Sequence, residues 1–236
     1  MSGGAPGRGA LRGSLPPRTC ARVRRSEVCV MTGQLLEEVF TNPGIDPRLT
    51  WRNPPARWAV EPERGVLVVE PAAKTDYWQR THYGFRNDNG PFLFTRAGGD
   101  FVMTCHVRFR PAHQYDQAGL MVRIAESCWL KTSVEFEPDG PSRLGAVVTN
   151  AGYSDWSTQP FPSDRREIWL RVRREGPDYL VDSSDDGAAW TQIRMAHLHE
   201  DDGAREVECG LYACSPLGEG FVAEFDRLRI APGRVG

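Results

Sequence analysis

Short apolar runs recur along most of the chain, and polar and turn-forming residues separate them. In the clearest run, Phe101, Met103 and Cys105 occupy every second position, which is the period of a strand with one buried face. Many short strands of this kind are typical of an antiparallel sandwich or barrel, and no strand–helix alternation indicates a parallel sheet. The expected strands cover residues 65–70, 100–109, 119–124, 129–136, 143–149, 168–173, 179–183, 190–195, 208–213 and 221–230, and residues 34–40 fit a helical turn or a short strand.

The first 31 residues differ from the rest because they are rich in Gly, Pro and Arg and show no apolar period. Such a segment buries too little apolar surface to offset the entropy lost on ordering. We therefore predict a disordered basic tail at 1–31 and one β-sandwich domain at 32–236. A nucleic-acid or targeting arm is the functional alternative for the tail, and Met31 has the features of a natural start.

Composition narrows the classes of partner. The 236 residues carry a formal net charge of -2, which gives no strong attraction to nucleic acid or to a membrane. No apolar stretch approaches the roughly 20 residues of a membrane helix, and no secretory signal follows the basic N-terminus. The six cysteines lack zinc-site spacing, so we predict buried free thiols in a reducing compartment, the cytoplasm. They are Cys20, Cys29, Cys105, Cys128, Cys209 and Cys214.

Two consecutive predicted strands carry a polar face. Leu120 and Val122 share the apolar side of the first, while Gly119 lies on the other side. A hairpin formed by the two strands would bring Glu135 near Gln117 or Gly119, and a glycine in mid-strand leaves room for a ligand to approach the backbone. The alternative is a solvated sheet face with cross-strand ion pairs. The polar face consists of Gln117, Arg123, Lys131 and Glu135.

Two loop-like segments, residues 75–78 and 150–157, combine aromatic rings with Asp and hydroxyl side chains. Sugars bind such surfaces because their CH faces stack on rings while their hydroxyls find donors and acceptors. In the alternative interpretation, Trp78 and Trp156 have a purely structural role and fill the edges of the sandwich. A ligand site on the polar face, flanked by these segments, is the functional interpretation.

Catalytic and metal motifs are incomplete. Glu135 paired with Asp116 or Asp155 is the one carboxylate pair that we nominate for glycosidic cleavage, with Glu135 as general acid or nucleophile. His197 and His199 lack a third metal ligand, and no phosphate-binding or dinucleotide motif is present. We predict no metal and no cofactor, and a non-catalytic role is favoured while an enzyme stays open.

Several segments, taken in order, resemble a known family. They are Trp51 with Pro54-Pro55 and Trp58, then residues 75–78, 115–123, 129–131 with Glu135, 147–149 and 154–157. Together they resemble the domain-of-unknown-function 1349 family of regulation-of-enolase-like proteins, in the concanavalin A-like lectin/glucanase superfamily. The resemblance implies a jelly-roll sandwich of two curved sheets, and sugars lie across the concave sheet in relatives of that superfamily. It implies no established activity, although the family name suggests regulation in carbon metabolism.

The sequence thus predicts an all-β antiparallel jelly-roll sandwich that binds a carbohydrate or a polar metabolite on the concave sheet. A glycoside hydrolase or lyase using Glu135, and a protein-interaction module, are the alternatives. Nucleic acid and membrane are not expected partners. The predicted ligand-binding residues are Asp76, Tyr77, Trp78, Tyr115, Asp116, Gln117, Arg123, Lys131, Glu135, Asp155 and Trp156.

Overall fold

The computed structural model describes residues 1, 3, 36–55 and 57–233, and every regular element among them is a β-strand. The tail predicted at 1–31 lies outside the described residues except for Met1 and Gly3, so it stays a prediction. Within the predicted 34–40 element, Leu36–Glu38 form a strand, β1, and not a helical turn.

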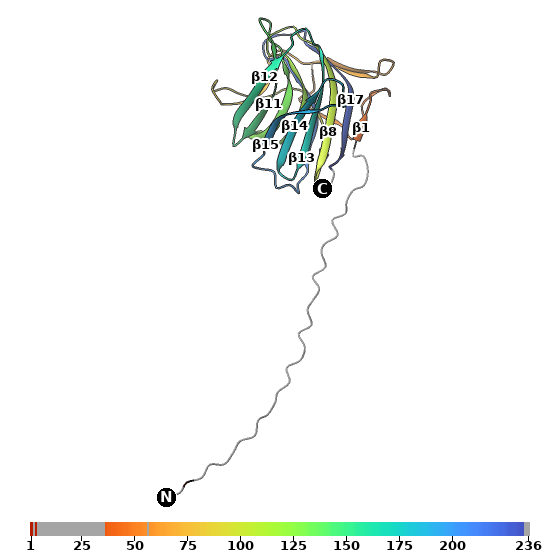
Figure 1. Ribbon diagram of the computed structural model, residues 1–236. Coiled ribbons are helices and arrows are strands. Elements are labelled where there is room, and N and C mark those ends of the chain that lie inside the picture. The colour runs from red at the N-terminus through yellow and green to blue at the C-terminus, as the bar shows by residue number, and fades with distance from the viewer. Residues whose placement is uncertain (2, 4–35, 56, 234–236) are drawn as a thin grey trace. The chain divides into compact units, whose positions relative to one another are not determined.

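Two antiparallel sheets form the sandwich, which confirms the predicted fold class (Figure 1). The eight-stranded sheet has the order β15-β14-β13-β8-β17-β4-β3, and β1 also pairs with β17. Its strands are β3 (Arg57–Glu61), β4 (Val66–Glu70), β8 (Phe101–Arg110), β13 (Glu167–Glu175), β14 (Asp178–Ser184), β15 (Thr191–His197) and β17 (Val222–Pro232).

The seven-stranded sheet has the order β12-β11-β10-β9-β16-β7-β2, and a separate two-stranded hairpin joins β5 to β6. The strands of this sheet are β2 (Thr50–Arg52), β7 (Phe92–Ala97), β9 (Gln117–Ala125), β10 (Cys128–Glu135), β11 (Ser142–Asn150), β12 (Tyr153–Phe161) and β16 (Val207–Cys214). The hairpin consists of β5 (Tyr77–Gln79) and β6 (Arg86–Asp88).

The main core lies between the two sheets. Leu120 and Val122 of β9 are fully buried there, together with Met103 and Cys105 of β8 in the other sheet. Burial of each large apolar side chain of this kind contributes about 1.5–3 kcal/mol relative to exposure. The apolar period in the sequence therefore corresponds to the inner faces of the sheets.

A second apolar cluster lies on the outer face of the seven-stranded sheet, the face that points away from the other sheet. Met121, Trp129 and Tyr212 of the sheet are buried there beneath Tyr77 and Trp78 of the β5–β6 hairpin. The ring of Tyr77 meets those of Trp129 and Tyr212 edge-on, with centroids 6.0 Å and 6.4 Å away. The hairpin thus covers part of the outer face.

Both segments that were expected to be loops contain strands. Residues 153–157 belong to β12, and residues 77 and 78 belong to β5, so a purely loop-like conformation is the wrong prediction for them. Because β12 is an edge strand with many exposed residues and β5 has three residues, neither shows the apolar alternation that marks an inner strand.

The room beside Gly119 is already used by the protein. A Cβ atom at this position would lie 2.1 Å from the carbonyl oxygen of Thr132 and 2.8 Å from Cδ1 of Leu170. The glycine therefore permits close approach of the neighbouring strand and of the facing sheet. The expectation that it admits a ligand is wrong.

We expect Gly119→Ala to lower the free energy of unfolding by about 1–3 kcal/mol, because the added methyl group overpacks the sheet. Urea denaturation measures this change. Gly140→Ala is the matched control, since a Cβ atom there meets nothing within 4 Å. Equal effects of the two substitutions would contradict the packing role of Gly119.

Candidate functional site

The floor of the candidate site is formed by β9 and β10. Their register places Glu135 opposite Gln117, as predicted, and Lys131 opposite Met121. Since alternate residues of a strand share a face, Gln117, Lys131 and Glu135 project from the outer face of the sheet. The inner face of the same strands belongs to the main core.

Lys131 is a buried cation with defined partners. Its side chain is 2% exposed, and its Nζ donates to Oε1 of Gln117 at 2.8 Å and pairs with Oδ1 of Asp76 at 3.3 Å. The ammonium group also lies 5.7 Å from the ring centroid of Tyr212. Burial opposes the charge, but the nearby carboxylates of Asp76 and Glu135 outweigh it and raise the pKa of Lys131.

Glu135 has a different environment although it lies on the same strand. Its residue is 8% exposed, and among the described residues no group donates a hydrogen bond to its carboxyl. Burial raises the pKa of Glu135 from 4.5 to about 7, and Asp76 and Glu137 add to the rise while Lys131 opposes it. The carboxyl of Glu135 therefore holds its proton to higher pH than an exposed glutamate does.

The β5–β6 hairpin forms one wall above this floor. Its position is fixed where the Tyr77 hydroxyl donates to the carbonyl oxygen of Gly90 at 2.6 Å and where Nδ2 of Asn53 donates to the carbonyl oxygen of Asp88 at 3.0 Å. Gly90 permits the contact with Tyr77 because a Cβ atom at this position would lie 2.7 Å from Cε2 of Tyr77 and 2.4 Å from Sγ of Cys214. The hairpin is therefore packed closely against the sheet and holds its aromatic residues beside β10.

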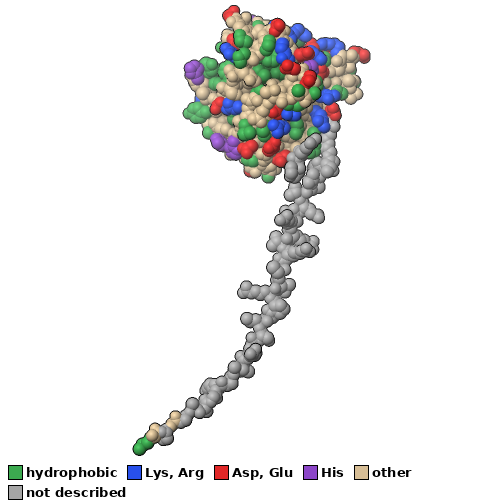
Figure 2. Space-filling model, viewed as in Figure 1, with side chains coloured by type: hydrophobic (Ala, Val, Ile, Leu, Met, Phe, Trp, Pro, Cys, Tyr) green, Lys and Arg blue, Asp and Glu red, His purple; other side chains and the backbone are tan. Residues whose placement is uncertain are grey.

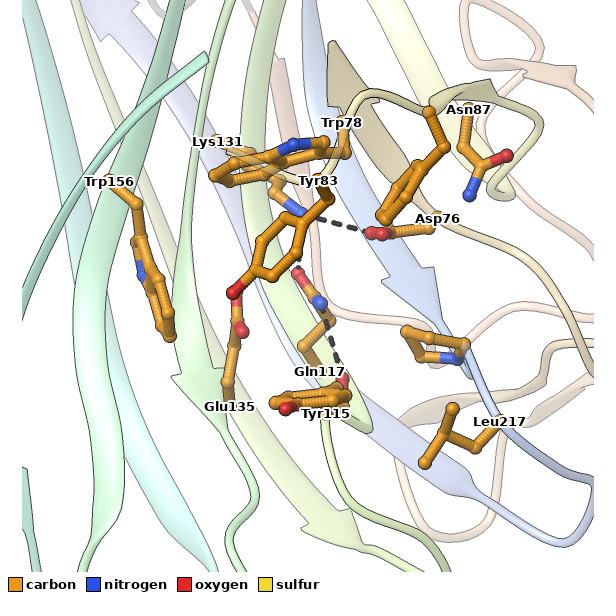
Figure 3. A pocket seen from close by; sticks show the side chains of 12 residues that line it. Asp76, Trp78, Tyr83, Asn87, Tyr115, Gln117, Lys131, Glu135, Trp156 and Leu217 are labelled. Atoms are coloured by element: carbon orange, nitrogen blue, oxygen red, sulfur yellow. Dashed lines mark hydrogen bonds and ion pairs between the residues drawn. The ribbon is translucent and has the colours of Figure 1, made fainter. Parts of the chain in front are cut away.

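Floor and wall enclose a cavity of about 340 Å³, which we call the outer-face pocket. This volume is at the lower end of the range for small-molecule sites. Figure 3 shows aromatic rings around the cavity, with Gln117, Lys131 and Glu135 projecting into it. The lining residues are Asp76, Trp78, Tyr83, Phe85, Asn87, Tyr115, Gln117, Lys131, Glu135, Trp156, Pro216 and Leu217.

Most residues nominated from the sequence meet in this pocket, and four lie elsewhere. Those that line it are Asp76, Trp78, Tyr115, Gln117, Lys131, Glu135 and Trp156. Trp78 and Trp156 are packed against apolar neighbours as well, so each combines the edge-plugging role with a place in the pocket wall.

The other four nominated residues have structural partners. Tyr77 belongs to the hairpin and is buried against the sheet. Asp116 accepts hydrogen bonds from the Ser215 hydroxyl and from the backbone amides of residues 112 and 113. Arg123 pairs with Asp88 at 2.7 Å. Asp155, with its side chain 70% exposed, pairs with Arg194 at 2.8 Å. None of the four lines the outer-face pocket.

Five lining residues were not nominated from the sequence. Tyr83 and Phe85 lie between the two strands of the β5–β6 hairpin. Asn87, Pro216 and Leu217 reach the pocket through the return strand of the hairpin and through the segment after β16, and no local pattern marks them. Tertiary placement alone brings them together.

Among the residues that the structure describes, no group of three His, Cys, Asp or Glu side chains lies close enough together to bind a metal ion. In the same part of the chain, no helix has the length and apolar character needed to cross a membrane. On the face seen in Figure 2, basic and acidic side chains are interspersed, without an extensive patch of either sign.

The raised pKa of Glu135 makes a stability prediction. The folded protein retains the proton to higher pH than the unfolded chain, so the stabilisation that it provides at low pH is lost as pH rises from 4.5 to about 7. We expect Glu135→Gln to gain up to about 3 kcal/mol of unfolding free energy relative to the parent protein across this window. Urea denaturation across this pH range measures the difference, and parallel pH profiles would contradict the burial of an ionisable Glu135.

Relatives in sequence were found for most of the chain. A family described as "Protein of unknown function (DUF1349)" matches residues 51–233. The Saccharomyces cerevisiae protein named "Regulation of enolase protein 1" is 38% identical over 176 residues, which are 75% of this chain and 85% of the yeast protein. A crystal structure of a functionally unknown protein from the same organism has a TM-score of 0.72 at 35% identity, and the match covers 79% of this chain and 97% of that one.

More distant structures share the fold alone. A Bacteroides ovatus xyloglucan-locus protein of the GH43 group has a TM-score of 0.67 at 19% identity, over 84% of this chain and 39% of that one. A CBM2 module from Lactobacillus casei phage J-1 has a TM-score of 0.58 at 8% identity, over 86% of this chain and 97% of that one. These matches agree with the sandwich, and the sequence relatives define the group: this chain belongs to the DUF1349 family.

Proposed function

We propose that this protein is a non-catalytic binding module that holds a carbohydrate or a related polar metabolite in the outer-face pocket. The observation that carries the proposal is the pairing of aromatic walls with a polar floor in one cavity. Rings of Trp78 and Trp156 offer stacking surfaces, while Gln117, Lys131 and Glu135 offer polar groups. A monosaccharide-sized ligand needs both kinds of contact.

Glu135 supports the idea that the pocket receives a polar group. Its carboxyl lines the pocket, accepts no hydrogen bond from the described residues, and is penalised by partial burial when it ionises. A ligand that supplies a donor to Glu135 would remove that penalty. Its affinity would therefore draw on a hydrogen bond to Glu135 that none of the described residues makes.

A hydrolase or lyase on the same face is the second candidate. Glu135, with its pKa raised by burial to about 7, has the property of a general acid. The partners nominated for it, Asp116 and Asp155, lie outside the pocket, and Asp76 is the other carboxylate in its lining. Release of product from chromogenic glycosides, abolished by Glu135→Gln, would favour this candidate over pure binding.

A protein-interaction role is favoured by the exposed apolar side chains at the rim. Tyr83, Phe85 and Leu217 are 55%, 44% and 57% exposed while also lining the pocket. Exposed aromatic groups of this kind anchor protein partners, and the name of the yeast relative refers to regulation of enolase. Recovery of a partner protein by the parent chain but not by Trp156→Ala would support this role.

A cytoplasmic location accompanies the proposal. Cys105, Cys128, Cys209 and Cys214 are buried free thiols, and burial raises the pKa of all four. Thiols of this kind are ordinary in a reducing compartment.

We expect at least one sugar or polar metabolite in a thermal-shift panel to stabilise the protein, and Trp156→Ala and Glu135→Ala to abolish that shift. The physical reason is the loss of a stacking surface or of the unbonded carboxyl. Trp58→Ala is the control, since Trp58 is 40% exposed on β3 of the other sheet. A ligand shift that survives both pocket substitutions, or a panel without any shift, would refute the proposal.

A further inference from the structure

We propose that the ligand of the outer-face pocket carries an organic ammonium group, which the aromatic rings enclose and the Glu135 carboxylate neutralises. This inference rests on the proposed binding function and names the chemical class of its ligand. An amino sugar or another small amine meets both descriptions. The inference depends on the charge balance of the pocket and on the position of its rings.

The charge balance leaves one carboxylate without a cation. Three charged side chains line the pocket: Asp76, Lys131 and Glu135. The ammonium of Lys131 pairs with Asp76 at 3.3 Å and donates to Gln117 at 2.8 Å, and among the described residues it forms no ion pair with Glu135. The cavity therefore becomes singly negative when Glu135 ionises, which favours a ligand of charge +1.

In the described part of the chain, the other charged and titratable groups around Glu135 form no ion pair with its carboxyl. Arg143 lies opposite Glu135 in the register of β11, yet no ion pair joins them among the residues described. Glu137 accepts a hydrogen bond from Gln114 at 2.8 Å and adds negative charge nearby. Burial raises the pKa of Tyr115, so its hydroxyl stays neutral around pH 7. The charge of Lys131 opposes the rise in the pKa of Glu135, but among the described residues neither Lys131 nor Arg143 forms an ion pair with its carboxyl.

The walls are suited to the same cation. Ammonium groups are attracted to the faces of aromatic rings, and the attraction grows when water is excluded. Figure 3 shows Trp78, Tyr83, Tyr115 and Trp156 on different sides of the cavity in which Glu135 stands. Phe85 also lines the cavity and stacks on Tyr83 with ring centroids 5.7 Å apart. Rings around a carboxylate are the arrangement of an aromatic cage for ammonium ligands.

A neutral hydroxyl group would satisfy less of this site. It can donate one hydrogen bond to Glu135, but it does not compensate the negative charge that burial penalises. An ammonium group provides both a counter-charge and a surface for the rings. Ligand binding should therefore favour the ionised carboxylate and release a proton at neutral pH.

Choline and its uncharged isostere 3,3-dimethyl-1-butanol provide the test, because they share a shape and differ by one positive charge. We expect choline to bind the full chain at least about tenfold more tightly than the alcohol, and about tenfold more tightly near pH 8 than near pH 6, as ionisation of Glu135 requires. Isothermal titration calorimetry measures both ratios. Choline does not titrate in this range, so the pH dependence reports on the protein.

Matched variants make the result specific to the pocket. Glu135→Gln should weaken choline binding about tenfold or more and remove its pH dependence, while Glu175→Gln, at an exposed acid on β13 of the other sheet, should change neither. Circular dichroism and urea denaturation establish that both variants are folded.

Glucose separates this inference from the function on which it rests. If glucose binds in a Trp156-dependent manner while choline does not bind, the ammonium inference fails and the binding function stands. If neither they nor any member of the metabolite panel binds, both fail. Equal affinity for choline and the alcohol would also overturn the inference, since it would show that the rings recognise shape alone.

Discussion

The buried ammonium of Lys131 is the interaction on which the outer-face pocket depends. Nζ joins Gln117 of β9 to Asp76, which directly precedes β5, so one charge ties the floor of the pocket to its wall. A buried charge of this kind is tolerated where it is paired and hydrogen-bonded. The second apolar cluster, in which Tyr77 packs against Trp129 and Tyr212, supports the same junction from below.

The choice of Asp76 as the ion-pair partner of Lys131 affects the pKa of Glu135. Because Lys131 makes its ion pair with Asp76, burial dominates at Glu135 and raises its pKa to about 7. Of the two carboxyl groups that line the cavity, Asp76 has an ion-pair partner, while Glu135 has none among the described residues. The sandwich supplies the floor of the pocket, and the hairpin supplies aromatic rings of its wall. The carboxyl of Glu135, which has no hydrogen-bond partner among the described residues, supplies a polar group for a ligand. The family relationship fixes neither the ligand nor a reaction, so these features carry the functional proposal.

The sequence predicted those features that follow from alternation along single strands. It placed Gln117, Lys131 and Glu135 on one face because the period of two continues through β9 and β10, and the register agrees. It did not predict the ion pair between Arg123 and Asp88, because that pair depends on how the β5–β6 hairpin folds back over the sheet. Leu217 and Asn87 were missed for the same reason. Likewise, Gly119 gave no local sign that Thr132 and Leu170 fill the space beside it.

Carboxyl-detected NMR of protein labelled at Glu Cδ tests the central claim most directly, since it follows the ionisation of Glu135 itself. We expect one glutamate, absent from the spectrum of Glu135→Gln, to titrate with a pKa of about 7. Asp76→Asn should move that pKa downwards, because it removes a negative charge and frees Lys131 to interact with Glu135. A Glu135 pKa at or below its ordinary value of 4.5 in the parent protein would contradict the assignment of Lys131 to Asp76 and of an uncompensated carboxyl to the pocket.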